Sequence, residues 1–265
     1  MEGIRRHDVV LEGAVASGLK IRLRPMTDAD FGILARWNRD PEVLYFSEGE
    51  NVFSYSTEEV RGIYAEASRT AFCFMISAEG RLVGECWLQR MNLERILSAH
   101  PGVDCRRIDL MLGEKECWGR GIGTETIRLL TRFGFEREGA GMVFGVGIAD
   151  YNQRSLKAFQ KAGYRTVGGS ENPKGSKAKY TYDTAFSRED YFRMKQRETA
   201  VSGEGETLRL QRLARVCQEC PVCRLARAKQ KGLAFWFVKN VEGRICPACK
   251  AYEKIHGRKA HEPLS

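Results

Sequence analysis

The stretch Trp118-Gly-Arg-Gly-Ile-Gly-Thr124 decides the fold of this chain. Its alternating glycines remove Cβ atoms from a short turn, so successive backbone N–H groups can close around a phosphate. The pattern predicts a strand before this loop, over 106–112, and a helix after it, from Thr124 to about Phe135. The positive end of the helix dipole adds to the attraction for an anion. A glycine-rich stretch alone is more often a plain turn, but these flanks favour a phosphate site.

The size and composition of the chain are those of a water-soluble protein. Its 265 residues provide for one full domain and a small second one. The hydrophobic content is 43% and the charged content 29%, which are ordinary values. The sequence has no apolar run long enough for a membrane span, and its first eight residues lack the apolar core of a signal peptide. We therefore expect a cytoplasmic protein that does not contact a membrane.

Charge and cysteines divide the chain into two unlike parts. The net charge is +9, and residues 207–265 carry 13 Lys/Arg against 4 Asp/Glu, so this excess lies entirely in the tail. Five of the nine cysteines lie there too, after a glycine-rich stretch at 202–206 with the composition of a linker. We predict an N-terminal extension (1–18), a main domain (19–196), a linker (197–208) and a basic four-cysteine domain (209–265).

Alternating and helical patterns run through the main domain in a definite order. Capping signatures at 27–30 and 56–59 predict two helices, and residues 91–105 form a long connection. Asn152-Gln-Arg-Ser155 opens another helix, for which a simple helix cap is the alternative reading. Further strands are predicted at 20–25, 71–77, 82–88, 142–148 and 180–186, with the glycine-containing turn 79–80 making a hairpin of the second and third.

The loop, the Asn152 motif and this order of elements resemble the GNAT superfamily of acyl-CoA-dependent N-acyltransferases, over roughly residues 19–196. The family motif reads Gln/Arg-x-x-Gly-x-Gly/Ala, and Trp118 departs from it at the first position. Leu23-Arg-Pro, Arg107-Ile-Asp109 and Phe159-Gln-Lys-Ala-Gly-Tyr164 are similar to aminoglycoside 6'-N-acetyltransferases. The resemblance implies an α/β (α+β) fold with a mixed, mostly antiparallel sheet flanked by helices.

The resemblance also implies a binding site for acetyl-CoA as cosubstrate. A splayed strand around residues 109–112 offers a backbone N–H to the thioester carbonyl, and the substrate amine attacks without an acyl-enzyme intermediate. The cofactor-binding residues carried over are Leu110, Met111, Leu112, Trp118, Gly119, Arg120, Gly121, Ile122, Gly123, Thr124, Asn152, Ser155 and Phe159.

Three residues are candidates for catalysis. Strand alternation places Asp109 on the face opposite Ile108, where it serves either as a base or in a salt bridge with Arg107. Glu85 is a second acid on a strand that the resemblance turns towards the substrate. Phe159 occupies the position of the family's acidic tyrosine, so either the thiolate leaves without a dedicated acid or another tyrosine, such as Tyr164, replaces it.

The cysteines of the tail have metal-binding spacing. Cys220-Pro-Val-Cys223 and Cys246-Pro-Ala-Cys249 are separated by 22 residues, which predicts four thiolates around a structural Zn²⁺ ion. Cys217 offers an alternative first pair with Cys220, and disulfides are the alternative chemistry. The second motif and the residues after it resemble half of a GATA-type zinc finger. We therefore expect a small zinc-ribbon or finger domain.

The overall expectation is an N-acetyltransferase that acts on a primary amine of an aminoglycoside-like or polyamine-like small molecule. A protein N-terminus or lysine is the alternative acceptor. The basic tail adds a possible nucleic-acid partner, which gives the competing hypothesis of a DNA- or RNA-binding regulator that senses acetyl-CoA. A purely structural or protein-docking tail is the other alternative, and the oligomeric state stays open.

Overall fold

The computed structural model describes residues 3–48 and 52–263, with the side chains of 201–204 excepted. The chain divides into two compact units, Met1–Tyr191 and Phe192–Ser265. Within the part of the chain that is described, no helix has both the length and the apolar character that crossing a bilayer requires.

The first unit is built on one eight-stranded sheet with the order β1-β2-β3-β4-β5-β6-β8-β7. Neighbouring strands are antiparallel except β5 and β6, which run parallel. This mixed, mostly antiparallel sheet flanked by helices confirms the expected fold class. The strands are β1 (Leu11–Ala14), β2 (Lys20–Pro25), β3 (Ala71–Ala78), β4 (Arg81–Arg90), β5 (Cys105–Leu112), β6 (Met142–Ala149), β7 (Arg165–Glu171) and β8 (Tyr180–Ser187).

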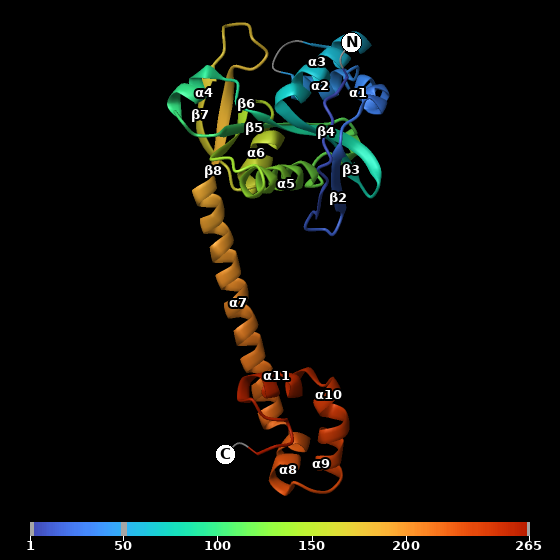
Figure 1. Cartoon of the computed structure of the whole chain (residues 1–265), viewed down its shortest axis with the longest axis vertical. Helices are drawn as coiled ribbons and strands as arrows, with labels where there is room; N and C mark the ends of the chain where they lie inside the picture. The colour runs from blue at the N-terminus through green and yellow to red at the C-terminus, as the bar shows by residue number, and fades with distance from the viewer. Residues whose placement is uncertain (1–2, 49–51, 264–265) are drawn as a thin grey trace. The chain divides into compact units, whose positions relative to one another are not determined.

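Helices cover both faces of the sheet (Figure 1). Alternation along β3 shows why, because Phe72 and Phe74 contact Phe133 of α5 on one face, while Cys73 and Met75 join the core under α1 and α3 on the other. The helical elements of this unit are η1 (Asp28–Asp30), α1 (Phe31–Trp37), α2 (Pro41–Ser47), α3 (Thr57–Thr70), α4 (Glu94–Ala99), η2 (Lys115–Cys117), α5 (Ile122–Glu136) and α6 (Gln153–Lys161).

The predicted caps and the hairpin turn are present. Ser56 accepts from the backbone N–H of Glu59, whose side chain accepts from the N–H of Ser56, so the capping box at the start of α3 is complete. Glu79 and Gly80 have φ values of 49° and 80° in the turn between β3 and β4. Strands β1 and β7 and helices α2 and α4 are additional to the elements that the sequence predicted.

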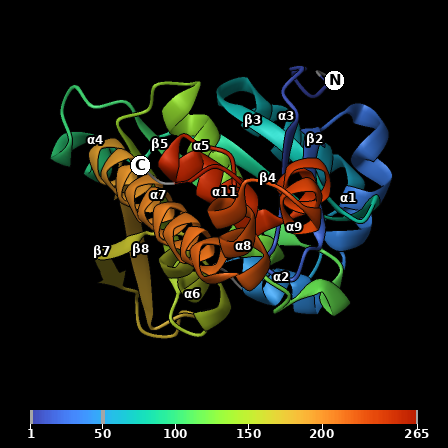
Figure 2. The ribbon, with the colours of Figure 1, turned by 90° about the horizontal axis from the view of Figure 1, so that it is seen from below.

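The second unit is helical. Helices α8 (Pro221–Lys229), α9 (Leu233–Phe237) and α11 (Pro247–His256) gather at the C-terminal end of α7 (Arg188–Glu219), with the short segments η3 (Val238–Glu242) and α10 (Gly243–Ile245) between them (Figures 1 and 2). The described residues of this unit form helices, and the strands of a zinc ribbon are not among them. Helix α7 also runs through 197–208, where the composition predicted a linker. Its many good helix-forming residues outweigh two glycines, which cost about 1 kcal/mol each.

Candidate active site

The sheet opens between β5 and β6. Their parallel pairing covers only Cys105–Arg107 against Met142–Phe144, and β6 is bulged between Gly145 and Ile148. The carboxylate of Asp183 accepts from the N–H of Gly147 at 3.0 Å and is paired with Arg95. Beyond its pairing with β6, β5 therefore has a free edge.

A cavity of about 520 Å³ lies at this opening. Residues of β5, the glycine-rich loop, the first turn of α5 and the first turn of α6 line it. All the residues predicted to bind the cofactor line this cavity except Arg120 and Phe159. Phe159 instead fills the space over Gly145, where an added Cβ would lie 2.5 Å from its ring. That these residues bind the cofactor stays a prediction.

The glycine-rich loop needs its glycines for their backbone conformation. Gly119 and Gly121 have φ values of 75° and 85°, in the left-handed region. An added Cβ at Gly121 would have ordinary contacts, the nearest 3.6 Å away, so backbone conformation and not space selects glycine there. Gly121 is the N-cap of α5, whose first N–H groups have no partner within the helix. These N–H groups adjoin the cavity and suit an anion.

Asn152 has two structural tasks. Its side-chain oxygen accepts from the N–H of Ser155 at 3.2 Å and so caps α6. Its side-chain nitrogen donates to the carbonyl oxygen of Phe46 at 2.8 Å, which ties α6 to the end of α2. Asn152 also lines the cavity. Asn152 is therefore a helix cap, as the alternative interpretation held, and it also forms part of the cavity wall.

Arg154 lies between two aromatic rings, a feature that the sequence analysis missed. Its guanidinium carbon is 4.1 Å from the ring centre of Trp118 and 4.3 Å from that of Phe46. The indole of Trp118 in turn donates to the carbonyl oxygen of Leu112 at 2.8 Å. Trp118 replaces the Gln or Arg that the family motif has at its first position. It has a structural role there, because it contacts both Arg154 and the end of β5.

The cavity wall carries an excess of positive charge. Its single acid, Glu125, is 3.6 Å from Arg128. A polyphosphate group is the ligand chemistry that such a wall favours at a helix N-terminus. The cationic lining residues are Arg128, Arg154, Lys157 and Lys161.

Asp109 is tied to neighbouring side chains. Arg107 donates to both of its carboxylate oxygens at 2.8 and 2.5 Å, and the indole of Trp87 donates at 2.9 Å. The salt bridge that the sequence offered as the alternative is therefore present. Asp109 precedes Leu110 of the cavity wall, and both of its carboxylate oxygens are occupied.

Glu85 has a free oxygen in the interior. It lies on β4 opposite Met111, which lines the cavity, and its side chain is 4% exposed. Its Oε2 has no hydrogen-bond partner among the described residues. Burial raises the pKa of Glu85 well above its usual range, and the charge of Asp109 raises it further, while a hydrogen bond with Tyr64 acts in the opposite direction. When it is ionised, a carboxyl with a raised pKa is a stronger base than an ordinary carboxylate.

Glu48 is a third carboxylate at this place and was missed from the sequence. It follows Ser47, a residue of the cavity wall. Burial raises its pKa, a hydrogen bond with Tyr55 and the charge of Lys177 lower it, and the charge of Asp109 raises it. Burial and Glu48 together raise the pKa of Tyr55 to about 12. Nothing in the local sequence around Glu48 marks it as part of a site.

Tyr164 lies in the core. Its hydroxyl is 2.6 Å from that of Thr131, and its ring contacts Phe159 and Phe186. Burial raises the pKa of Tyr164, and it is not among the residues of the cavity wall. This position gives its hydroxyl a structural partner and no contact with the cavity.

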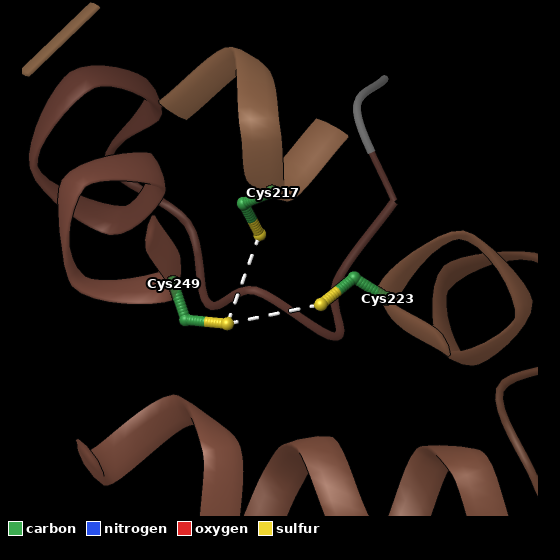
Figure 3. Close-up of side chains that lie close together, drawn as sticks. All are labelled: Cys217, Cys223 and Cys249. Atoms are coloured by element: carbon green, nitrogen blue, oxygen red, sulfur yellow. Dashed lines mark hydrogen bonds between the residues drawn. The ribbon is translucent and has the colours of Figure 1, made fainter. Parts of the chain in front are cut away.

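Three cysteines of the second unit lie together (Figure 3). The sulfur of Cys249 is 3.8 Å from that of Cys217 and 3.7 Å from that of Cys223. Cys220 and Cys246 are partly exposed and pack against the edge of this group. The structure thus brings two of the four predicted metal ligands together and adds Cys217 to them.

Comparison with known proteins identifies the family. Residues 20–165 match the acetyltransferase (GNAT) domain family. Aminoglycoside N(6')-acetyltransferase type 1 from Klebsiella pneumoniae is 22% identical over 192 residues, which cover 70% of this chain and 92% of that protein. The fold is similar to aminoglycoside acetyltransferase AAC(6')-Ib in complex with coenzyme A (TM-score 0.53, 18% identity, 66% of this chain and 99% of the other). It is also similar to spermidine N-acetyltransferase from Vibrio cholerae in complex with CoA and spermine (TM-score 0.54, 14% identity, 65% and 98%). The chain therefore belongs to the GNAT family of acyl-CoA-dependent N-acetyltransferases.

Proposed function

We propose that this enzyme acetylates a primary amine of a small molecule that carries several positive charges, as aminoglycoside-like and polyamine-like compounds do. The observation that carries the proposal is the group of carboxylates Glu48, Glu85 and Asp109 beside the cavity wall. They are close enough that Asp109 and Glu48 both raise the pKa of Glu85. Arg107 forms an ion pair with Asp109. A cationic acceptor would bring positive charge to the other two carboxyl groups and so favour their ionised forms.

The names of similar proteins support this acceptor class. One relative is an aminoglycoside acetyltransferase, and one structural neighbour is a spermidine acetyltransferase with bound spermine. Both named substrates carry several amino groups. A protein N-terminus or lysine is the alternative acceptor.

In the proposed reaction, the loop at 119–123 and the first turn of α5 bind the pyrophosphate of acetyl-CoA, with the cationic side chains nearby. The thioester lies along the free edge of β5, where backbone N–H groups stabilise the developing oxyanion. Glu85 accepts a proton from the ammonium group, directly or through water. The amine nitrogen then forms a bond to the carbonyl carbon, the carbon–sulfur bond breaks, and coenzyme A leaves as the thiolate, which takes up the second proton of the attacking nitrogen directly or through water.

The other two catalytic candidates receive different roles. Asp109 supplies negative charge and positions neighbouring groups, because Arg107 and Trp87 already occupy its oxygens. Tyr164 receives no proton-transfer role, because its hydroxyl contacts Thr131 in the core. The thiolate then leaves without a dedicated acid, in agreement with phenylalanine at position 159.

We propose also that the second unit binds a structural zinc ion through its cysteines. The two Cys-Pro-x-Cys motifs support this, since each places two thiols at the start of a helix, in α8 and in α11. Zinc is the ion that such thiolate sites in proteins most often hold.

The acceptor class is tested by measuring coenzyme A release with a panel of amines. We expect turnover of spermidine and kanamycin, and a much lower kcat/KM for a monoamine and for a peptide with a free N-terminus. The Glu48→Gln variant should raise KM for the multiply charged amines and leave KM for the monoamine nearly unchanged. Acetyl-CoA binding without turnover of any amine refutes the proposal, and preference for the peptide supports the alternative acceptor.

A further inference from the structure

The group of thiols in the second unit joins three separate segments of the chain. Cys217 lies in the last turn of α7, Cys223 in the first turn of α8 and Cys249 in the first turn of α11. Their sulfur atoms all lie within 4.8 Å of one another, and the residues are buried (Figure 3). Three buried thiols from three helices form a candidate metal site that depends on the fold and not on a single sequence motif.

The spacing of these sulfurs fits a single tetrahedral metal ion. Zinc–sulfur bonds of about 2.3 Å place the thiolates of a tetrahedral site about 3.8 Å apart. The observed separations from Cys249 are 3.8 Å to Cys217 and 3.7 Å to Cys223. A disulfide requires about 2.05 Å. A [4Fe–4S] cluster binds each thiolate through a separate iron, which spreads the sulfurs further apart.

The surroundings of Cys217 suit a thiolate. Arg227 directs one N–H group at the sulfur of Cys217 at 3.8 Å and another at its carbonyl oxygen at 2.9 Å. The same guanidinium donates to the carbonyl oxygens of Gln218 at 2.9 Å and Ala260 at 3.0 Å. Such a contact beside a sulfur atom is the kind of outer contact that orients metal ligands.

The core of this unit is poor in large apolar side chains. Its ten buried members comprise five alanines and three cysteines, with Val238 and Tyr252 as the only larger residues. A unit of this size gains little from burying such small groups. A metal ion that joins three helices supplies the stabilisation that the core lacks.

We propose that Cys217, and not Cys220, is a ligand of the metal, which is held by Cys217, Cys223, Cys246 and Cys249. This assignment rests on the proposed zinc binding and replaces one of the four ligands that the sequence spacing predicts. Cys246, which begins the same motif as Cys249, completes the set in this assignment; Cys220 packs against the same core, and the variants below separate the two. Cys220 occupies the N-cap position of α8, where its side chain makes no capping hydrogen bond.

A matched pair of variants of the full chain, Cys217→Ser and Cys220→Ser, tests the assignment. Zinc affinity is measured by competition with a chromophoric chelator, and the ligand set by the absorption spectrum of the cobalt(II)-substituted protein. For Cys217→Ser we expect an affinity about 100-fold lower and a spectrum that has lost one thiolate. For Cys220→Ser we expect an affinity within about twofold of wild type and an unchanged four-thiolate spectrum. Cys246→Ser should behave like Cys217→Ser.

The outcomes separate the two proposals. Wild-type protein that binds no zinc refutes zinc binding itself. A wild type that binds one zinc ion, with Cys220→Ser weakened and Cys217→Ser unchanged, overturns only the ligand assignment. Purification with iron and acid-labile sulfide in place of zinc overturns both.

Discussion

Replacing Glu85 by glutamine should make the protein more stable and less active. Burial, followed by the charges of Asp109 and Glu48, raises the pKa of Glu85 well above its ordinary value of 4.5. The folded state therefore retains a proton that the unfolded state releases above about pH 4.5. Stability falls as the pH rises from there to the folded-state pKa, by up to about 1.4 kcal/mol per pH unit.

Between pH 5.5 and 7.5, the unfolding free energy of the wild type should fall because Glu85 releases its proton on unfolding, and that of Glu85→Gln should not show this fall. Urea denaturation of both proteins across this range gives the difference. Other titrating groups largely cancel in the comparison because both proteins contain them.

The activity of Glu85→Gln should change in the opposite direction. Loss of a general base lowers kcat/KM by about 10²- to 10⁴-fold, whereas the Kd for acetyl-CoA should stay within about twofold of wild type. Asp109→Asn is the control for removing a neighbouring carboxylate. It breaks the ion pair with Arg107 and should lower the free energy of unfolding by about 1 kcal/mol, whereas Glu85→Gln should raise it. A Glu85→Gln variant with full activity refutes the role of Glu85 as a base. One that is less stable than wild type at pH 7.5 refutes the argument from burial.

Three further substitutions test the cavity. Gly121→Ala should lower the free energy of unfolding by about 1 to 2 kcal/mol, because φ is 85° there, and it should weaken acetyl-CoA binding. Thermal melting with and without acetyl-CoA measures both effects. A melting temperature equal to that of wild type contradicts the prediction. Arg154→Met should lower acetyl-CoA affinity about tenfold, less at high salt; calorimetric titration at two salt concentrations checks this. Asp183→Asn should lower stability by about 1 to 3 kcal/mol, because it breaks the ion pair with Arg95 at the bulge of β6; urea denaturation equal to wild type refutes it.

Much of the fold could be predicted because its signals are local. A capping box, a tight turn and strand alternation each depend on a few neighbouring residues. Strand β7 could not be predicted in this way, because Gly168 and Gly169 are typical of a turn. Pairing with β8 makes them part of a strand, and an added Cβ at Gly169 would lie 2.1 Å from the carbonyl oxygen of Thr181.

In the candidate site, too, local motifs could be recognised from the sequence and contacts between distant residues could not. The loop at 118–124 and Asn152 are local motifs that can be recognised in the sequence, and in the structure they line the cavity, while their binding of acetyl-CoA stays a prediction. Phe46 and Glu48 reach the site only because α2 packs beside α6, a contact between residues 106 positions apart in the sequence. Cys217 was ranked below Cys220 because spacing alone favours two Cys-x-x-Cys pairs. The domain limits and nucleic-acid binding by the basic tail stay predictions.

The measurement that tests the account most directly is a single turnover with isotopically labelled acetyl-CoA and the preferred amine from the panel, followed by mass spectrometry of the amine and of the protein. Direct attack on acetyl-CoA bound between β5 and α5 predicts that the labelled acetyl group moves to the amine at the rate of coenzyme A release. It also predicts that the protein never carries the label during the turnover. A labelled protein intermediate, or coenzyme A release that yields free acetate in place of acetylated amine, would contradict the account.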